Sequence, residues 1–390
     1  IALAEAVMRG GRLHRYNVAE GEQSLVARLE AAFAAYQGAR YCLAVASGGY
    51  AMATALRALG VGPGDAVLTN GFTLAPVPGA IAAVGAEPVL AEITPDLVLD
   101  LDDAAAKIER HAPKALMLSN MRGHLCDMDA LAALLARTGT PLIEDCAHTM
   151  GAAWNGRKSG GFGIAGCFST QTYKHLNSGE GGFVTSDDPA FMARAILLSG
   201  SYMLYERHGA APPPEAFEDV RLDTPNMSGR MDALRAAVLL PQLERLDENV
   251  ARWNARHDLL AERLAGAPGV RVPHRPPQER YVGSSFQFRA PEAPPETLRA
   301  IVSDAAALGV ELKWFGAEAP AGFTSAHRSW RYMPPQSLPR TDAILAGLLD
   351  MRVPLTFSLA DCAHIADILL HVLGDRLPSD AARPTDATPA

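Results

Sequence analysis

Apolar residues along the first half of the chain recur in two alternating patterns. Those between 25 and 36 have helical spacing and end near Gly38, which predicts an amphipathic opening helix. Short continuous apolar runs, which predict buried strands, lie at 41–46, 66–68, 88–93, 115–118 and 141–143. Helical segments separate these runs, the clearest at 128–137. Strands that alternate with helices at this spacing predict an α/β fold with a mostly parallel sheet covered on both faces.

The pattern changes in the second half of the chain. Residues 231 to about 265 have helical spacing, and we expect Pro241 to kink or divide this segment. Mixed helical and strand segments with proline-rich loops follow, and the last residues are polar without an apolar period. We therefore predict a large domain over residues 1–250, a small α+β domain over residues 251–377 and a disordered tail over residues 378–390.

Composition narrows the class of protein. The chain has 390 residues, of which 48% are hydrophobic and 20% charged, as is typical of a folded globular enzyme. No apolar run has the length of a membrane span, so we expect no membrane partner. The net charge of −8, without any basic block, argues against a nucleic acid partner.

The five cysteines are odd in number and scattered through apolar runs. This distribution predicts free thiols in a reducing cytoplasm, and neither a disulfide framework nor a metal site. The N-terminus has no basic start followed by an apolar stretch, as a signal peptide would have. Because the first residue is Ile1 and not Met, we expect that a few residues precede it.

The most informative polar stretch runs from 166 to 182. An apolar strand ends there in hydroxyl residues, Lys174 stands in a polar loop, and a glycine-rich turn precedes the next strand. About thirty residues upstream, another strand ends in Glu144-Asp145. A lysine that forms a Schiff base, an acid that keeps a pyridine nitrogen protonated and small residues that bind phosphate are the groups that hold pyridoxal phosphate. A solvated surface lysine beside a hairpin is the alternative for Lys174 alone.

Five motifs follow one another in a specific order and spacing. They are Gly62-Pro63-Gly64-Asp65, Ile143-Glu144-Asp145-Cys146-Ala147-His148, Gly166-Cys167-Phe168-Ser169, Lys174 with Gly179-Glu180-Gly181-Gly182, and Arg230-Met231. In these motifs the chain resembles the DegT–StrS family of fold-type I pyridoxal-phosphate enzymes, from Gly11 through the small domain. Its best-known members are aminotransferases that act on nucleotide-linked ketosugars and aminocyclitol precursors. The resemblance implies an aspartate aminotransferase-like fold and pyridoxal 5′-phosphate as the cofactor.

The resemblance also implies cofactor-binding roles. Lys174 would form the internal aldimine and then act as the base that moves a proton, and Asp145 would pair with the pyridinium nitrogen. His148 would lie near the phenolic oxygen of the cofactor. Ser47-Gly48-Gly49, where the family usually has Ser-Gly-Thr, would bind the phosphate together with Ser169. The structural alternatives are a turn cap for Asp145, a packing residue for His148 and an ordinary turn for Ser47-Gly48-Gly49.

The resemblance further implies a homodimer. In the family, an asparagine close to the Arg-Met pair reaches across the dimer interface to the other subunit's cofactor phosphate. Here Ser228 stands two residues before Arg230, and Asn226 stands two further back. We expect Asn226 to make this contact, with Ser228 as the alternative. Ser228 as the N-cap of the following helix is the purely structural explanation.

Three positions that lie near the substrate in relatives differ in this chain. Leu74 replaces an aromatic residue that stacks on the pyridine, and we expect Leu74 to cover the ring by apolar contact. Asn120-Met121-Arg122-Gly123 replaces His-Leu-Tyr-Gly, and Lys313-Trp314-Phe315 replaces a segment with a His-Tyr pair. Arg122 and Lys313 are therefore candidates for binding a carboxylate or phosphate of the substrate. The alternative is that both are solvated surface charges.

These inferences predict an aminotransferase that takes an amino group from glutamate or glutamine and delivers it to a keto sugar, cyclitol or related biosynthetic intermediate. A second hypothesis keeps the cofactor but changes the reaction to dehydration, decarboxylation or another cleavage. Relatives that dehydrate deoxysugars carry histidine in place of the lysine, so Lys174 argues against that branch. A third hypothesis is a regulatory protein of the same fold without turnover. It ranks last, because we expect no fused DNA-binding segment.

Overall fold

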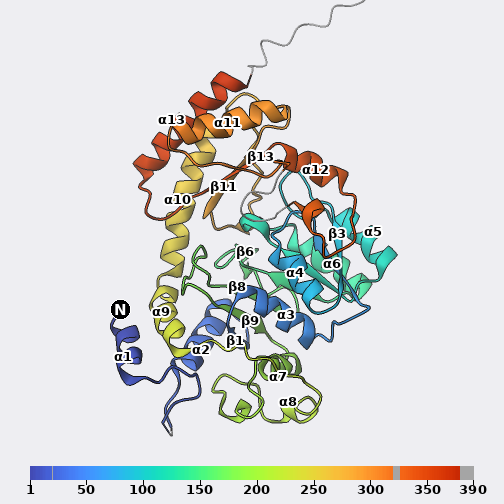
Figure 1. The fold of residues 1–390 in the computed structure, drawn as a ribbon, viewed down its shortest axis with the longest axis vertical. Helices are drawn as coiled ribbons and strands as arrows, with labels where there is room; N and C mark the ends of the chain where they lie inside the picture. The colour runs from blue at the N-terminus through green and yellow to red at the C-terminus, as the bar shows by residue number, and fades with distance from the viewer. Residues whose placement is uncertain (20, 319–325, 378–390) are drawn as a thin grey trace, which may run out of the picture.

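The computed structural model describes residues 1–19, 21–318 and 326–377. Its largest sheet has seven strands in the order β1-β9-β8-β5-β4-β2-β3 (Figure 1). The strands are β1 (Tyr41–Val45), β2 (Ala66–Asn70), β3 (Glu87–Ala91), β4 (Ala115–Ser119), β5 (Leu142–Asp145), β8 (Ala165–Ser169) and β9 (Gly182–Ser186). β9 runs antiparallel to both of its neighbours, and the other paired strands are parallel. The prediction of a mostly parallel sheet is confirmed.

Helices cover both faces of this sheet. One face packs under α3 (Gly48–Ala58), α4 (Pro76–Ala83), α7 (Pro189–Leu198) and α8 (Glu215–Glu218). The other packs under α2 (Leu25–Gln37), α5 (Leu101–His111), α6 (Met128–Thr138) and α9 (Ala233–Leu243), and α1 (Ala2–Gly10) lies against α9. Along β1, Cys42 and Ala44 join one core while Leu43 and Val45 join the other. Burial on both faces explains why these strands are continuous apolar runs.

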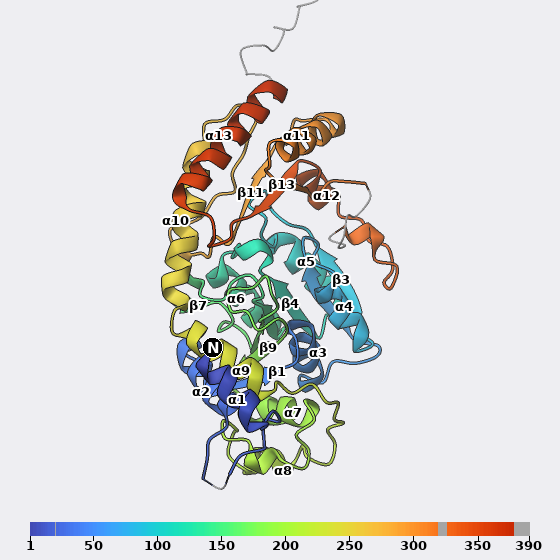
Figure 2. The same ribbon diagram turned by 60° about the vertical axis from the view of Figure 1, so that its left-hand side comes forward.

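The long helical segment of the second half is two helices. α9 ends at Leu243 and α10 runs from Leu246 to Leu264. The segment is divided near Pro241 but not at it, because Pro241 lies inside α9 and the break comes two residues later, after Leu243. Pro241 has no N–H to donate to the carbonyl of Ala237, and α9 ends two residues beyond it. α10 then extends from the large sheet to a second sheet (Figure 2).

The second sheet is small and antiparallel, in the order β11-β13-β12. Its strands are β11 (Ser285–Arg289), β12 (Lys313–Trp314) and β13 (Leu348–Arg352), and α10, α11 (Pro295–Ala307) and α13 (Leu359–Arg376) form a core with it. A third sheet joins β6 (Ala153–Trp154) to β7 (Arg157–Lys158) and β10 (Glu279–Arg280). The remaining elements are α12 (Pro339–Ala346), η1 (Met121–Gly123), η2 (Tyr205–Arg207) and η3 (His327–Ser329).

The predicted domain boundary at residue 250 falls within α10, and β10 returns to pair with β6. The division into residues 1–250 and 251–377 therefore stays a prediction. The predicted tail, 378–390, lies outside the described residues. Across the described ranges, no helix combines the length and the apolar character that crossing a membrane requires.

Candidate active site

Polar side chains gather where the strands of the large sheet end. Asp145 is the last residue of β5, which lies between β4, ending at Ser119, and β8, ending at Ser169. Ser47 follows β1 and begins α3. Because the carboxyl ends of parallel strands meet at one edge of a sheet, all four residues line one cavity of about 300 Å³, which we call the inner cavity.

Lys174 lines the inner cavity from the loop between β8 and β9. Its Nζ lies 3.0 Å from Nε2 of His148. Burial lowers the pKa of the Lys174 amine to about 8. Asp145 opposes this shift, and the positive charges of Arg122 and Arg352 add to it. This is not the environment of a solvated surface lysine, because the amine is held much closer to neutrality.

A backbone donor fixes the ring of His148. The N–H of Arg122, a residue with a left-handed φ of 57°, donates to Nδ1 of His148 at 3.4 Å. Burial, and then the nearby Lys174, lower the pKa of His148 well below its usual value, so the ring is neutral. A neutral ring that accepts at Nδ1 carries its proton on Nε2. That proton faces the amine of Lys174.

Asp145 is a buried carboxylate held by two donors. The N–H of Ala147 donates to Oδ1 at 3.1 Å, and the hydroxyl of Ser119 donates to Oδ2 at 3.3 Å. Burial raises the pKa of Asp145, and Lys174 and these donors oppose the shift. Among the described residues, no basic side chain forms an ion pair with Asp145. A cationic ligand group beside this carboxylate would compensate its burial.

The N-terminus of α3 forms another wall of the inner cavity. Ser47 is the N-cap, and its Oγ accepts the N–H of Tyr50 at 3.1 Å. A Cβ on Gly48 would lie 2.7 Å from Cβ of Ser169, so the close approach of α3 to β8 requires glycine there. A Cβ on Gly49 would meet only Oγ of Ser47, at 4.0 Å. Backbone N–H groups at such a helix start bind an anionic phosphate well.

Leu74 lines the inner cavity, whereas Phe72 does not. Phe72 is fully buried and packs edge-on against Phe315, with ring centroids 5.1 Å apart. An aliphatic side chain therefore takes the place of the usual aromatic wall. Together with Ala147, Leu74 gives the cavity apolar surface.

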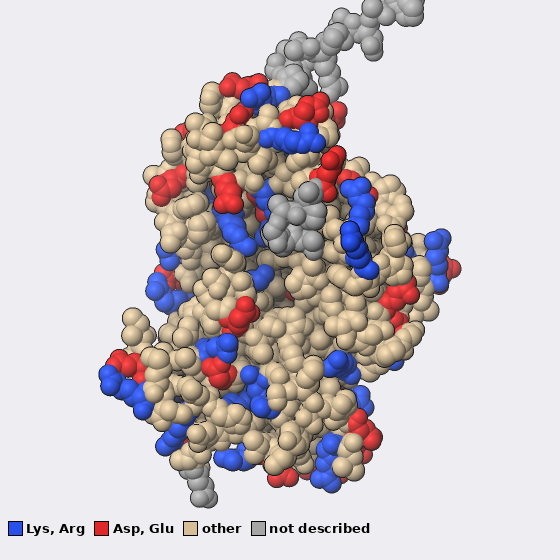
Figure 3. Space-filling model, in the orientation of Figure 1, with Lys and Arg blue, Asp and Glu red and all other residues tan. Residues whose placement is uncertain are grey.

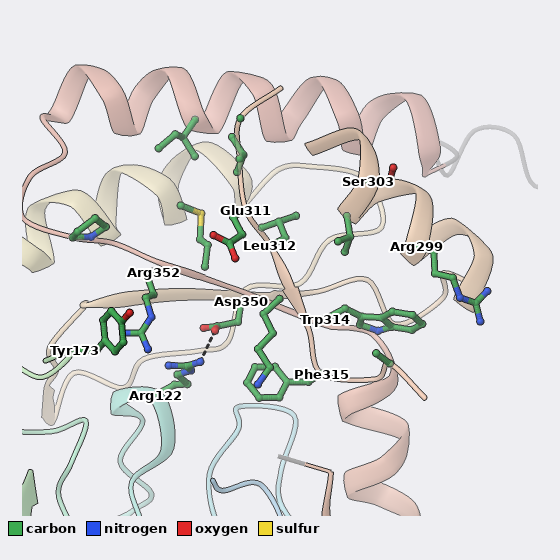
Figure 4. Close-up of a pocket in the computed structure, with 18 of the residues that line it drawn as sticks. Arg122, Tyr173, Arg299, Ser303, Glu311, Leu312, Trp314, Phe315, Asp350 and Arg352 are labelled. Carbon is green, nitrogen blue, oxygen red and sulfur yellow. Dashed lines mark ion pairs between the residues drawn. The ribbon is translucent and has the colours of Figure 1, made fainter. Parts of the chain in front are cut away.

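Arg122 and Lys313 line a neighbouring cavity of about 870 Å³, which we call the outer cavity (Figure 4). Arg122 forms a buried ion pair with Asp350, with 2.7 Å between Nη2 and Oδ2. Nζ of Lys313 lies 4.1 Å from the ring centroid of Phe315. Burial, and then Arg122, lower the pKa of Lys313 to about 7. The alternative of a solvated surface charge is therefore wrong for Arg122, whose charge is balanced by a buried carboxylate.

Asn226 is not part of the inner cavity of its own subunit. It is exposed, as is Ser228, in the segment before Arg230. Ser228 is not the N-cap of the next helix, because Asp232 accepts the N–H of Arg235 at 2.9 Å and α9 begins one residue later. The chain stays extended until then, since Arg230 forms a β-bridge with Val45. The role of Asn226 in a second subunit stays a prediction.

The sequence interpretation missed two residues that line both cavities, Tyr173 and Arg352. The guanidinium carbon of Arg352 lies 4.3 Å from the ring centroid of Tyr173. One signal was present, because Asp350 and Arg352 are charged at alternate positions of an apolar strand. Alternate residues share a face of a strand, which marks that face as polar. No cluster of three or more metal-ligating side chains occurs in the described residues.

The sheet order, the lysine in a strand-end loop and the buried acid together are typical of fold-type I pyridoxal-phosphate enzymes. The chain matches the model of the DegT/DnrJ/EryC1/StrS aminotransferase family over residues 5–370, and it belongs to this family. The prediction of the family and of the fold type is confirmed. Family membership indicates pyridoxal 5′-phosphate as the cofactor.

Named relatives differ in their substrates. The chain is 37% identical over 263 residues to the L-glutamine:2-deoxy-scyllo-inosose aminotransferase of Streptoalloteichus tenebrarius, covering 67% of this chain but only 61% of that relative's length. It is 33% identical over 291 residues to the GDP-perosamine synthase of Caulobacter vibrioides, covering 73% and 74% of the two chains. The crystal structure of 3-amino-5-hydroxybenzoic acid synthase superposes with a TM-score of 0.82 at 28% identity, covering 96% of each chain.

The inner cavity fits the cofactor. Asp145 is a buried carboxylate to which no basic side chain is paired among the described residues, and it suits a protonated pyridine nitrogen. Gly48 packs closely on Ser169 at the start of α3, and the backbone N–H groups there suit a phosphate. Lys174 has a lowered pKa, as a Schiff-base lysine requires.

Proposed function

We propose that this protein is a pyridoxal-phosphate-dependent aminotransferase. In this proposal it moves an amino group from glutamate or glutamine to a keto sugar, cyclitol or related biosynthetic intermediate. The observation that carries the proposal is the amine of Lys174, held near neutrality beside His148 in a cavity that also contains a buried carboxylate and an open helix start. Aminotransferase relatives that act on inososes and on a GDP-linked sugar support the class of acceptor.

Bound in the inner cavity, pyridoxal phosphate supplies an electron sink that acidifies the substrate carbon bearing the amine. Asp145 would hold positive charge on the ring nitrogen, and Ser47, Gly48, Gly49 and Ser169 would hold the phosphate. The neutral Nζ of Lys174 takes the proton from the substrate carbon and returns it. His148 Nε2 orients that amine, and the apolar surface of Leu74 and Ala147 would exclude water from the bound cofactor.

The assembly belongs to the same proposal. We infer a homodimer in which Asn226 reaches the phosphate bound by the other subunit, since its exposed segment is free of the inner cavity of its own chain. The boundary near residue 250 separates a large cofactor domain from a small domain that completes the substrate site. A cytoplasmic location agrees with the five cysteines, all of them free and buried.

Absorbance of the cofactor tests the reaction. Addition of glutamine or glutamate should replace a band at about 410–430 nm with one at about 330 nm, because the first half-reaction changes only the cofactor. Mass spectrometry should then find the matching 2-oxo acid, which net transamination must release and which dehydration or decarboxylation would not. A full set of common amino donors that leaves the spectrum unchanged would refute the transaminase proposal.

A further inference from the structure

Arg122 has a backbone conformation that is unusual for a residue with a side chain. Its φ of 57° and ψ of 20° are left-handed, in the middle of η1. This conformation is unfavourable for a residue with a Cβ, so surrounding contacts must hold it. With this backbone the N–H of Arg122 donates to Nδ1 of His148 at 3.4 Å. An unfavourable conformation is therefore maintained directly beside the histidine that contacts Lys174.

The side chain of Arg122 is anchored on the small sheet. Its Nη2 lies 2.7 Å from Oδ2 of Asp350 on β13, and the two side chains are only 4% and 3% exposed. Figure 4 shows this ion pair. In Figure 3 the surface of the same region is hollowed, with basic side chains around the hollow. Because both charges of the pair are buried, neither side chain can leave without losing its compensation.

Asp350 is itself held in place within the small sheet. Its Oδ1 accepts from Nε2 of Gln287 at 2.7 Å, and Oε1 of Gln287 lies 2.9 Å from Nε2 of His124. Leu349 and Met351, on either side of Asp350, join the core beneath α11 and α13. Alternate residues of a strand point to opposite faces, so Asp350 is turned away from that core. A carboxylate fixed in this way can hold a guanidinium partner in one position.

The N–H of Arg122 decides which nitrogen of His148 carries the proton. A neutral ring that accepts at Nδ1 has its proton on Nε2, which lies 3.0 Å from Nζ of Lys174. An Nε2–H can donate to a neutral amine but repels an ammonium group. In the other tautomer, a bare Nε2 would accept from the ammonium group and stabilise it. The tautomer set by Arg122 therefore favours the neutral amine, the form that can take a proton.

We propose that Arg122 and Asp350 are positioning residues for Lys174. The buried ion pair holds the left-handed backbone of Arg122, and this backbone fixes the tautomer of His148. The role rests on the proposed function, in which Lys174 is the base. Neither positioning residue takes part in proton transfer. Both act through the ring that contacts the amine.

Several charged and titratable groups lie around the amine of Lys174, and a test of this role has to keep them constant. They are Asp145, His148, Arg122, Tyr173, His175, Glu180 and Arg352. The charge of Asp350 also raises the pKa of Arg352 and of Lys313. A single substitution of Asp350 therefore changes the electrostatic field as well as the backbone of Arg122. Two double variants, Arg122→Gly with Asp350→Asn and Arg122→Ala with Asp350→Asn, remove the same charges and leave neither partner of the pair alone.

The two double variants differ in the backbone preference of residue 122. Glycine adopts a left-handed φ readily, whereas alanine does not. We expect the glycine double to keep the Nε2–H tautomer of His148 and the alanine double to lose part of it. Nitrogen NMR of histidine-labelled protein reads the tautomer, with pyridoxamine 5′-phosphate bound and again without cofactor, and His148→Gln identifies the signal. Equal tautomer populations in the two doubles would show that the turn alone holds the backbone, through the N–H of Gly123 on the carbonyl of Asn120, and would overturn the proposal.

The pKa of Lys174 gives a second measurement. A bare Nε2 stabilises the ammonium form, so the Lys174 pKa should be higher in the alanine double than in the glycine double. An amine reacts with a labelling reagent when it is neutral. Labelling of Lys174 in the cofactor-free protein, followed by mass spectrometry, should therefore begin about one pH unit higher in the alanine double. Labelling profiles that coincide would refute the positioning role.

Kinetics and a matched control complete the test. With a reactive donor, kcat of the alanine double should lie about tenfold or more below that of the glycine double, with little change in KM. Ser284→Ala is the control, because it removes another contact between the small sheet and the lysine loop, the 3.0 Å contact of Ser284 Oγ with Nε2 of His175. It should leave the tautomer of His148 unchanged. If no donor reacts while the tautomer still follows residue 122, the aminotransferase proposal fails and the link from Asp350 to His148 stands.

Discussion

The inner and outer cavities share residues but are built in different ways. In the inner cavity the backbone helps to fix several groups: an N–H holds Asp145, another holds His148, and Gly48 lies against Ser169. In the outer cavity the groups are side chains of a small sheet, and contacts such as that of Arg122 with Asp350 set their positions. A site whose shape is set by the backbone keeps its ligand when single side chains change. A site formed by side chains can change its ligand through one substitution. This difference explains why the cofactor half matches the family and the substrate half departs from it.

Lys174→Ala breaks the inner cavity most directly. The variant loses the proton carrier, so we expect a fall in kcat of about 10³-fold or more and loss of the absorbance band of the lysine-bound cofactor. Steady-state kinetics and absorbance spectra measure both. Lys114→Ala, at an exposed lysine paired with Asp65, serves as the control and should retain activity. Full activity in Lys174→Ala would overturn the assignment of the catalytic residue.

Arg122→Gln tests the buried ion pair between the two cavities through its effect on stability, since Arg122 lines both of them. Removing one partner leaves Asp350 buried and unpaired, which we expect to cost about 3–5 kcal/mol in the free energy of unfolding. Urea unfolding gives this value. The double variant Arg122→Gln with Asp350→Asn should lose less, because no charge stays uncompensated. Arg263→Gln, in an exposed pair with Asp367, should change the free energy by less than about 1 kcal/mol. An equal loss of unfolding free energy in Arg122→Gln and Arg263→Gln would show that burial of the ion pair does not matter.

Gly48→Ala and Gly49→Ala form a matched test of the helix start. At Gly48 the new methyl would lie 2.7 Å from Cβ of Ser169, and we expect displacement of α3 to cost about 1–3 kcal/mol, seen as a weaker Kd for the cofactor. At Gly49 the same change meets nothing closer than 4.0 Å and should have little effect. Fluorescence titration with pyridoxal phosphate measures both constants. Equal effects at the two positions would show that the close approach to β8 does not matter.

Arg352→Gln should have the smallest effect of these variants, a shift in the pKa of Lys174. Arg352 is one of the cations that lower the pKa of Lys174, so its removal should raise that pKa from about 8. The amine is neutral above its pKa, so its reactivity should begin at higher pH in the variant. Labelling of the cofactor-free protein with an amine reagent, followed by mass spectrometry across pH 6–10 as a rough range, measures the shift. A shift to lower pH would contradict the placement of the guanidinium. Arg299→Gln is the control and should leave the profile unchanged.

Much of the inner cavity could be predicted from the sequence, because its groups follow recognisable strands. Apolar runs located β4 and β5 within a residue or two. The loop that carries Lys174 lies between two further strands, β8 and β9. Parallel strands then bring their polar ends together whatever the details of the loops. Pro241 indicated a break in this segment but not its position, because α9 continues for two residues beyond the proline.

The outer cavity was predicted less well, since it depends on pairings between distant strands. Arg122 was a candidate for the substrate, but its partner Asp350 is more than two hundred residues away in sequence and only the fold brings them together. Arg352 was missed for the same reason, although its alternation with Asp350 was visible. The role proposed for Asn226 requires a second subunit, which no single-chain pattern determines.

The contacts of Arg122 have a consequence for how this protein could diversify. Its backbone holds the ring of His148, while its side chain holds Asp350. Positions 122 and 350 should therefore be exchanged together among descendants, because each single step leaves a buried charge alone. Position 352 can change without leaving a buried charge unpaired, because no carboxylate among the described residues forms an ion pair with Arg352. Substitutions should accordingly arise first at 352, with 122 and 350 inherited as a unit.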